Sequence, residues 1–372
     1  MDGNFVGNDC NPAMMRTVEE SRGTKIGIIG WDIGGVNVKA SWLPGWKDPD
    51  KKLRVTSLPF EIWRDKSGLV QVLKEAYEDL CPDTQPGAMA VTMSAELSDV
   101  FASKREGVLF VVECVRDFFP DTAIHFMDVS GAFSTLEHVR ERPLEFAASN
   151  WVASAQWIAR KRPSCLLVDV GSTTTDIIPI LEGEICAKGR TDTARLQSGE
   201  LVYSGVLRTN LAAIVQSIPI SGKPCRIASE YFTISGDVHL ILGNIRPEEY
   251  SCPTPDNRPP TVASARRRLA RLVCADEETL SAPEIDAMAR YIYTQQVLQI
   301  RSGIEQVVAA RPELRSHPVV VHGAGTFLGR DAVEGVGLKQ LLEESDLSPA
   351  ESATLPCLSV AYLLASELKE TP

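Results

Sequence analysis

The feature that most constrains how this chain folds is the segment 164–181, in which two apolar runs flank a short polar turn. The first run ends in Asp169, and Gly171 opens the turn. Two apolar runs joined in this way predict a buried β-hairpin. Glycine permits backbone angles that let main-chain N–H groups converge on an anion, and Asp169 is placed to hold a metal ion or orient a water. The candidate phosphate-binding residues of this turn are Gly171, Ser172, Thr173 and Thr174. Alternatively, the hydroxyl groups satisfy only their own turn.

A second copy of the pattern lies near the start of the chain, at residues 26–40. An apolar run ends in Asp32, a glycine follows two residues later, and another apolar run begins at Val38. Two such hairpins in one chain predict a duplicated domain that holds a phosphate between its halves. The candidate phosphate-binding residues of this copy are Gly34, Gly35 and Asn37.

Strands and helices alternate along the rest of the chain, which predicts two α/β halves around one cleft. We expect a flexible lead-in at 1–24, a first half at 25–162 and a second half at 163–372, with a loop-rich insertion at about 217–260. Apolar runs predict strands at 53–58, 88–93, 123–129, 184–189 and 226–233, and a strand from Pro318 that ends in a glycine turn. Helical spacing predicts helices at 65–81, 104–119, 144–161, 200–214, 261–273, 282–310 and 355–368, the last of them packed on the second sheet.

Further candidate site residues lie where predicted strands end or helices begin, because ligands of open α/β sheets bind at such places. The candidates for substrate binding are Thr92, Ser94, Glu96, Tyr203, Arg208, Gly323 and Gly325. Glu200 is expected to hold an amine or hydroxyl of the substrate. Both glutamates have a structural alternative, a carboxylate in the first turn of a helix. The cluster of arginines at 266–271 binds an anion or forms a solvated basic face paired with the acidic segment at 276–278.

Composition disfavours several classes of function. The chain has 372 residues and a net charge of −11, which argues against broad binding to nucleic acid or anionic membranes. No apolar run is long enough to span a bilayer, and the first residues lack the basic and apolar regions of a signal peptide. Nine scattered cysteines without a Cys-x-x-Cys pair predict reduced thiols and a cytoplasmic location.

Five short motifs occur in order along the chain. They are Asp32-Ile-Gly-Gly-Val-Asn37, Thr92-Met-Ser-Ala-Glu-Leu97, Asp169-Val-Gly-Ser-Thr-Thr-Thr-Asp176, Gln197-Ser-Gly-Glu-Leu-Val-Tyr-Ser-Gly205 and His322-Gly-Ala-Gly325. With these motifs the two hairpins resemble the phosphate loops of the sugar kinase, heat-shock chaperone and actin superfamily. More narrowly, the chain resembles the hydantoinase A/oxoprolinase group and, within it, tetrahydromethanopterin-linked one-carbon transfer pathway proteins. The resemblance implies duplicated ribonuclease-H-like (actin-like ATPase) halves.

The narrow resemblance implies a transferase of methanofuran-type cofactor biosynthesis. Such an enzyme joins an aminomethylfuran diphosphate to a γ-glutamyltyramine-like amine or phenol acceptor and releases diphosphate. The hairpins would bind the diphosphate through a divalent cation, expected to be Mg²⁺, with Asp32 and Asp169 as its ligands and Glu200 as a third catalytic residue. The wider superfamily implies two alternatives: an ATP-dependent kinase or amide hydrolase, in which Asp32 or Asp169 activates a hydroxyl or water, and a nucleotide-binding protein without turnover. A homo-oligomer is compatible with each.

Overall fold

The architecture rests on two large sheets with similar topology. The computed structural model describes residues 27–45, 53–80, 85–338, 341–343 and 352–370. The predicted lead-in at 1–24 lies outside these residues. The first sheet has the order β3-β2-β1-β4-β5-β6 and the second has the order β10-β8-β7-β13-β14, with β9 paired to β8.

The first sheet is built from the segment before residue 135. Its strands are β1 (Ile28–Ile33), β2 (Asn37–Leu43), β3 (Arg54–Pro59), β4 (Ala88–Met93), β5 (Ala123–Met127) and β6 (Phe133–Ser134). All residues of β1 and β4 are buried, because helices cover both faces of this part of the sheet. The outer face is covered by α2 (Leu69–Leu80) and α3 (Lys104–Phe118), which pack into one core with the sheet.

The second sheet repeats the first. Its strands are β7 (Cys165–Val170), β8 (Thr175–Leu181), β9 (Glu184–Ile185), β10 (Leu201–Val202), β13 (Val319–His322) and β14 (Leu341–Glu343). In each sheet an antiparallel hairpin, β1–β2 or β7–β8, is followed in space by a parallel strand, β4 or β13. The predicted duplication and the predicted fold class are therefore confirmed.

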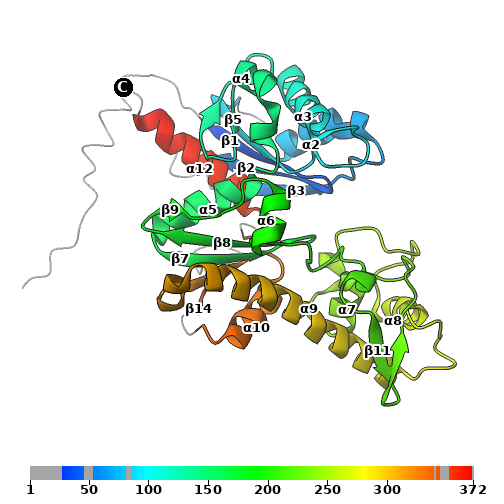
Figure 1. Cartoon of the computed structure of the whole chain (residues 1–372). Helices are drawn as coiled ribbons and strands as arrows, with labels where there is room; N and C mark the ends of the chain where they lie inside the picture. Colours follow the sequence, from blue (N-terminus) through cyan, green and yellow to red (C-terminus); the bar gives the residue numbers. More distant parts are fainter. Residues whose placement is uncertain (1–26, 46–52, 81–84, 339–340, 344–351, 371–372) are drawn as a thin grey trace, which may run out of the picture.

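Two helices form a layer between the sheets, α5 (Asn150–Lys161) and α12 (Leu355–Glu370) (Figure 1). One core joins α5 and α12 to the first sheet, and a second core joins them to β7, β8 and β13. The predicted packing of the last helix on the second sheet is therefore confirmed, and α12 also packs on the first sheet because both of its sides are apolar. The domain boundaries stay a prediction, and α12 contacts both proposed halves.

The helix α9 (Ala282–Ala310) extends from the second sheet into a separate lobe (Figure 1). Its C-terminal part packs under the sheet with α10 (Thr326–Val336), and its N-terminal part lies in another core. The lobe contains β11 (Ser217–Ile220), β12 (Lys223–Arg226), α7 (Ser235–Ile241) and α8 (Val262–Arg271). Remaining elements are α4 (Leu136–Glu141), α6 (Asp192–Ser198) and the 3-10 helices η1 (Lys66–Gly68), η2 (Pro143–Phe146), η3 (Leu211–Ala213), η4 (Pro247–Glu249) and η5 (Pro312–Ser316).

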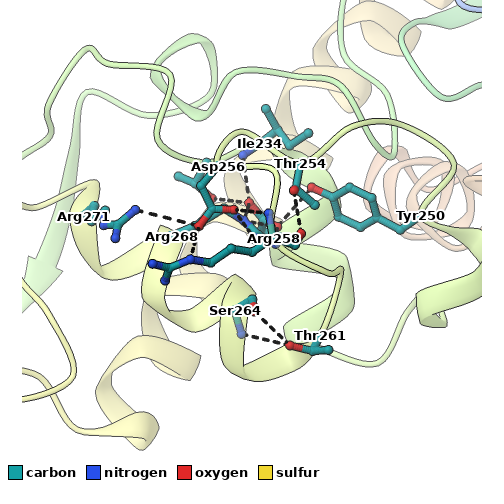
Figure 2. Close-up of polar contacts among 11 residues, drawn as sticks. Ile234, Tyr250, Thr254, Asp256, Arg258, Thr261, Ser264, Arg268 and Arg271 are labelled. Atoms are coloured by element: carbon teal, nitrogen blue, oxygen red, sulfur yellow. Dashed lines mark hydrogen bonds and ion pairs between the residues drawn. The ribbon is translucent and has the colours of Figure 1, made fainter.

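A buried ion pair holds the lobe together. Nε and Nη2 of Arg268 contact the carboxylate of Asp237 at 2.6 to 3.1 Å, and Nη1 donates to Asp256 at 2.9 Å. Figure 2 shows Arg268 beside Asp256, with Arg271 near the same carboxylate. Arg266 and Arg267 form ion pairs with Asp286 and Glu277. The arginine cluster thus forms ion pairs within the lobe, including the predicted pairing with the acidic segment at 276–278.

Two predicted elements were wrong, and one helix of the insertion was not predicted. Residues 200–214 do not form one helix, because Gly199 ends α6 in the left-handed conformation and the chain then enters β10. The strand predicted at 226–233 lies earlier, at 217–226, as the hairpin β11–β12. The insertion contains a buried helix, α7, although its composition predicted none.

Candidate functional site

The two duplicated turns have the same backbone geometry. In the first, the N–H of Gly34 donates to the carbonyl of Asn37 at 3.0 Å. In the second, the N–H of Gly171 donates to the carbonyl of Thr174 at 2.8 Å. The aspartate two residues before each glycine, Asp32 or Asp169, thereby occupies the same place at the end of its strand.

A neighbouring segment braces each turn through its carbonyl groups. The N–H of Phe60 donates to Val36, and the N–H of Ile62 donates to Gly35. In the second half, the N–H of Val206 donates to Gly171, and those of Leu207 and Arg208 donate to Ser172. These contacts use the carbonyl groups of the turn. The N–H groups of Ser172, Thr173 and Thr174 take no part in them and have no hydrogen-bond partner among the described residues. Such free N–H groups in a turn are suited to bind an anion.

Asp32 and Asp169 lie close enough for their charges to interact. Burial raises the pKa of Asp32, the nearby ammonium of Lys39 lowers it, and the carboxylate of Asp169 raises it, so that the net pKa lies above its ordinary value. Lys39 lies opposite Asp32 in the β1–β2 register, with Nζ 3.9 Å from Oδ2. Asp32 Oδ1 is buried and has no hydrogen-bond partner in the described part of the chain.

Asp169 is paired with a histidine from the adjacent strand. His322 lies opposite it in the β7–β13 register, and Nδ1 is 3.8 Å from Asp169 Oδ1, an ion-pair distance longer than a hydrogen bond. Ser352 Oγ lies 3.0 Å from the other ring nitrogen, Nε2. Burial raises the pKa of Asp169, but His322 and Lys39 outweigh it and leave the pKa below its ordinary value. Asp169 is therefore ionised at neutral pH.

The donor set fits a magnesium ion that also binds a phosphate. Within the described residues no group of three or more His, Cys, Asp or Glu could hold a metal alone. Mg²⁺ commonly binds one or two carboxylates and completes its coordination with waters and substrate phosphates. Asp32 and Asp169 supply two carboxylates, and the unpartnered Oδ1 of Asp32 is an available ligand atom.

The glycines of the turn after β13 allow close packing on the second hairpin. Gly323 has φ +89°, and a Cβ atom there would lie 2.4 Å from Asp169 Oδ1. Gly325 donates to the carbonyl of Val170 at 2.9 Å, and a Cβ there would meet the side chain of Val170 at 2.4 Å. Substrate binding by these glycines stays a prediction, and the packing gives each of them a structural reason.

Near the first turn, the predicted residues differ in their surroundings. Ser94 lies beside the turn, because a Cβ at Gly34 would be 3.6 Å from its Oγ. Thr92 is fully buried, and its Oγ1 lies 2.8 Å from Ser149 Oγ. Glu96 is buried with Oε1 3.8 Å from Lys104, and burial raises its pKa to about 7. Lys104 also contacts Asp192 of the second half at 2.7 Å.

The carboxylate of Glu200 is occupied by its own neighbourhood. It accepts hydrogen bonds from the N–H of Lys188 at 2.6 Å, the N–H of Gly189 at 2.9 Å and Ser198 Oγ at 2.8 Å. These bonds favour a structural role, although not the helix first turn weighed above. Tyr203 is 61% exposed, and its role in substrate binding stays a prediction.

Within the same segment, Arg208 reaches the first half. Its Nη1 lies 3.4 Å from Glu61 Oε1, and its guanidinium lies 4.9 Å from the ring centre of Trp63. The sequence analysis did not identify Glu61, Lys39 or His322 as site residues. The sequence did contain a signal for Lys39, since it is the one charged residue of β2.

Comparisons with known proteins show the family to which the chain belongs. Residues 88–355 match the hydantoinase/oxoprolinase family. The chain belongs to this family. It is 35% identical over 347 residues to the (4-{4-[2-(gamma-L-glutamylamino)ethyl]phenoxymethyl}furan-2-yl)methanamine synthase of Methanocaldococcus jannaschii, covering 92% of this chain and 99% of the relative. A protein of the same description from Methanococcus vannielii is 35% identical over 211 residues, which is 55% of this chain and 92% of that relative. The family predicted from the sequence motifs is thus confirmed.

A solved structure supports the fold. Nucleotide-free acetone carboxylase superposes with a TM-score of 0.58 at 10% identity, covering 91% of this chain and 70% of that protein. At this identity the similarity concerns the fold alone. None of the helices in the described ranges is long and apolar enough to cross a membrane.

Proposed function

We propose that this chain is a synthase that forms an aryl ether in methanofuran-type cofactor biosynthesis. It would join the furfuryl carbon of an aminomethylfuran diphosphate to the phenol oxygen of a γ-glutamyltyramine-like acceptor and release diphosphate. The similarity to the synthase of Methanocaldococcus jannaschii supports this proposal, because it extends over 99% of that relative. The name of that synthase describes a product with a phenoxymethylfuran ether and a γ-glutamylamino group.

The observation that carries the proposal is the pair of equivalent turns, each preceded by an aspartate, Asp32 or Asp169, whose charges interact. A diphosphate has two phosphoryl groups, and the duplicated hairpins offer one turn for each. Free N–H groups at 172–174 and the ammonium of Lys39 would stabilise the negative charge that develops on the leaving group. Asp32 and Asp169 would hold Mg²⁺, which when bound neutralises part of the diphosphate charge.

The reaction is a substitution at the furfuryl carbon. The bond from this carbon to the diphosphate oxygen breaks, and its electron pair leaves with diphosphate. A new bond forms from the phenol oxygen to the same carbon, and the phenol proton is lost to water. His322 and Lys39 lower the pKa of Asp169, so that its carboxylate would be available to hold the cation.

The test uses the purified chain with Mg²⁺, the aminomethylfuran diphosphate and γ-glutamyltyramine. We expect the ether product by mass spectrometry and one diphosphate released per ether, without a requirement for ATP. A parallel reaction contains ATP in place of the furan diphosphate. Release of phosphate from ATP without ether formation in the first reaction would contradict the proposal and favour an ATP-dependent kinase or hydrolase. A cytoplasmic location and a homo-oligomeric state stay predictions.

A further inference from the structure

A group of three side chains joins the two turn-bracing segments. Glu61 lies in the segment that hydrogen-bonds to the first turn, and Arg208 lies in the segment that hydrogen-bonds to the second. Arg208 Nη1 lies 3.4 Å from Glu61 Oε1, and its guanidinium packs against Trp63 with 4.9 Å to the ring centre. A positive and a negative group thus face each other across the two halves, each anchored beside one turn.

The contact between the two charges is loose. Charge-assisted N–H···O bonds are commonly about 2.7 to 2.9 Å, so the contact at 3.4 Å is longer than a well-formed bond of this kind. Of the guanidinium N–H donors of Arg208, only the one on Nη1 has a hydrogen-bond partner among the described residues. The stacking on Trp63 holds the guanidinium plane in place while its remaining donors stay available. Arg64 contacts the other oxygen of Glu61, Oε2, at 2.7 Å and fixes the carboxylate.

An arginine fork and a carboxylate held in this way suit a ligand with both charges. The fork of arginine binds a carboxylate through two parallel hydrogen bonds, and a carboxylate accepts hydrogen bonds from an ammonium. The α-carbon of an amino acid carries these two groups side by side. The same feature is present in a γ-glutamyl amide, in which the α-amino and α-carboxylate groups are free.

We propose that Arg208 and Glu61 bind the zwitterionic amino-acid end of the acceptor and select γ-glutamyl amides. Arg208 takes the α-carboxylate, Glu61 takes the α-ammonium, and Trp63 positions Arg208. This inference rests on the proposed function for the identity of the acceptor. It extends that function by naming the residues that distinguish a γ-glutamyl amide from a simple amine.

The test measures binding by calorimetry without the furan diphosphate, so it does not depend on turnover. Three probes are used: γ-glutamyltyramine, glutaryltyramine, which lacks the amino group, and 4-aminobutanoyltyramine, which lacks the carboxylate. Arg208→Gln should weaken the two carboxylate-bearing probes about 10- to 100-fold and change the third little. Glu61→Gln should weaken the two amine-bearing probes and change glutaryltyramine little.

Arg190→Gln is the matched control. Arg190 also joins the two halves, since its Nη1 donates to the carbonyl of Val129 at 3.0 Å, but it is not part of the Arg208 group. We expect this variant to bind all three probes as the wild type does. Equal weakening of all three probes in both Arg208→Gln and Arg208→Lys would overturn the proposal and make the contact a structural bridge. If these binding patterns hold but no ether forms, the proposed function fails and the recognition of γ-glutamyl amides stands.

Discussion

Loss of the buried arginine in the lobe should destabilise the chain far more than loss of its neighbour on the same helix. The side chain of Arg268 is fully buried, and so is that of its partner Asp237. Arg268→Met removes the positive charge and leaves Asp237 buried beside the hydroxyl of Tyr250, which donates to it at 3.1 Å. Breaking one partner of a buried ion pair costs about 3 to 5 kcal/mol, because the other charge is left uncompensated. The hydrogen bonds from Arg268 to Asp237 measure 2.6 to 3.1 Å, so we expect a loss in this range for Arg268→Met.

The control is Arg267→Met, since Arg267 pairs with Glu277 and the two side chains are 49% and 43% exposed. An exposed pair contributes about 0 to 1 kcal/mol. Urea unfolding followed by circular dichroism gives the free energy of unfolding of both variants. The comparison requires that the slope of this free energy against urea concentration is the same in both. A loss for Arg268→Met as small as that for Arg267→Met would refute the reasoning from burial. Ser235 of α7 donates to the carbonyl of Gly205, next to the segment 206–208 that hydrogen-bonds to the second turn. We therefore also expect the destabilised lobe to make this segment less ordered.

Three further predictions concern the junction of the two halves. Burial raises the pKa of Glu96 from 4.5 to about 7, so the folded chain holds a proton that the unfolded chain has lost between these pH values. The free energy of unfolding should therefore fall by on the order of 3 kcal/mol as pH rises from about 5 to about 8, and Glu96→Gln should remove this slope in urea titrations. Gly323→Ala should abolish most turnover by displacing Asp169, whereas Gly183→Ala, with φ +86° but open space around it, should lose only stability; equal kinetics in both variants would contradict this. Lys39→Met should raise the KM for the diphosphate ester about tenfold and leave the KM for the acceptor unchanged, because the lost ammonium lies 3.9 Å from Asp32, at the proposed diphosphate site.

Long and strongly patterned elements could be predicted from the sequence. The bounds expected for β4 and α9 agree with the structure, 88–93 and 282–310. Both have signals that extend over the whole element, an apolar run interrupted only by Thr92 in β4 and apolar residues at helical spacing in α9. The two hairpins were predictable because their pattern occurs twice, and each copy supports the interpretation of the other.

Elements that depend on tertiary contacts could not be predicted. The helix α7 lies in a segment rich in proline and is stabilised by the pairing of Asp237 with Arg268, 31 residues later. The segment after Gly199 contains helix-compatible residues, but β10 gains its hydrogen bonds from β8. Local sequence does not contain the information about either partner.

In the candidate site, only the residues that belong to a local sequence pattern could be predicted. Asp32 and Asp169 stand out because each ends an apolar strand before a glycine turn. The positions of Lys39 and His322 beside them follow from strand register, which becomes known only when the sheets are assembled. Conversely, Glu200 is a carboxylate in a polar segment, as expected of a site residue. Only the structure shows that its carboxylate accepts hydrogen bonds from backbone N–H groups.

The binding of diphosphate to single and double variants tests the central claim most directly. Calorimetry with diphosphate and Mg²⁺ compares the wild type with Asp32→Asn, Asp169→Asn and the double variant. If both carboxylates serve one bound diphosphate, each single variant should lose most of the affinity and the double variant should lose little more, since residues that act together are not additive. Wild-type affinity in both single variants, or small losses that simply add, would contradict a shared site between the two turns.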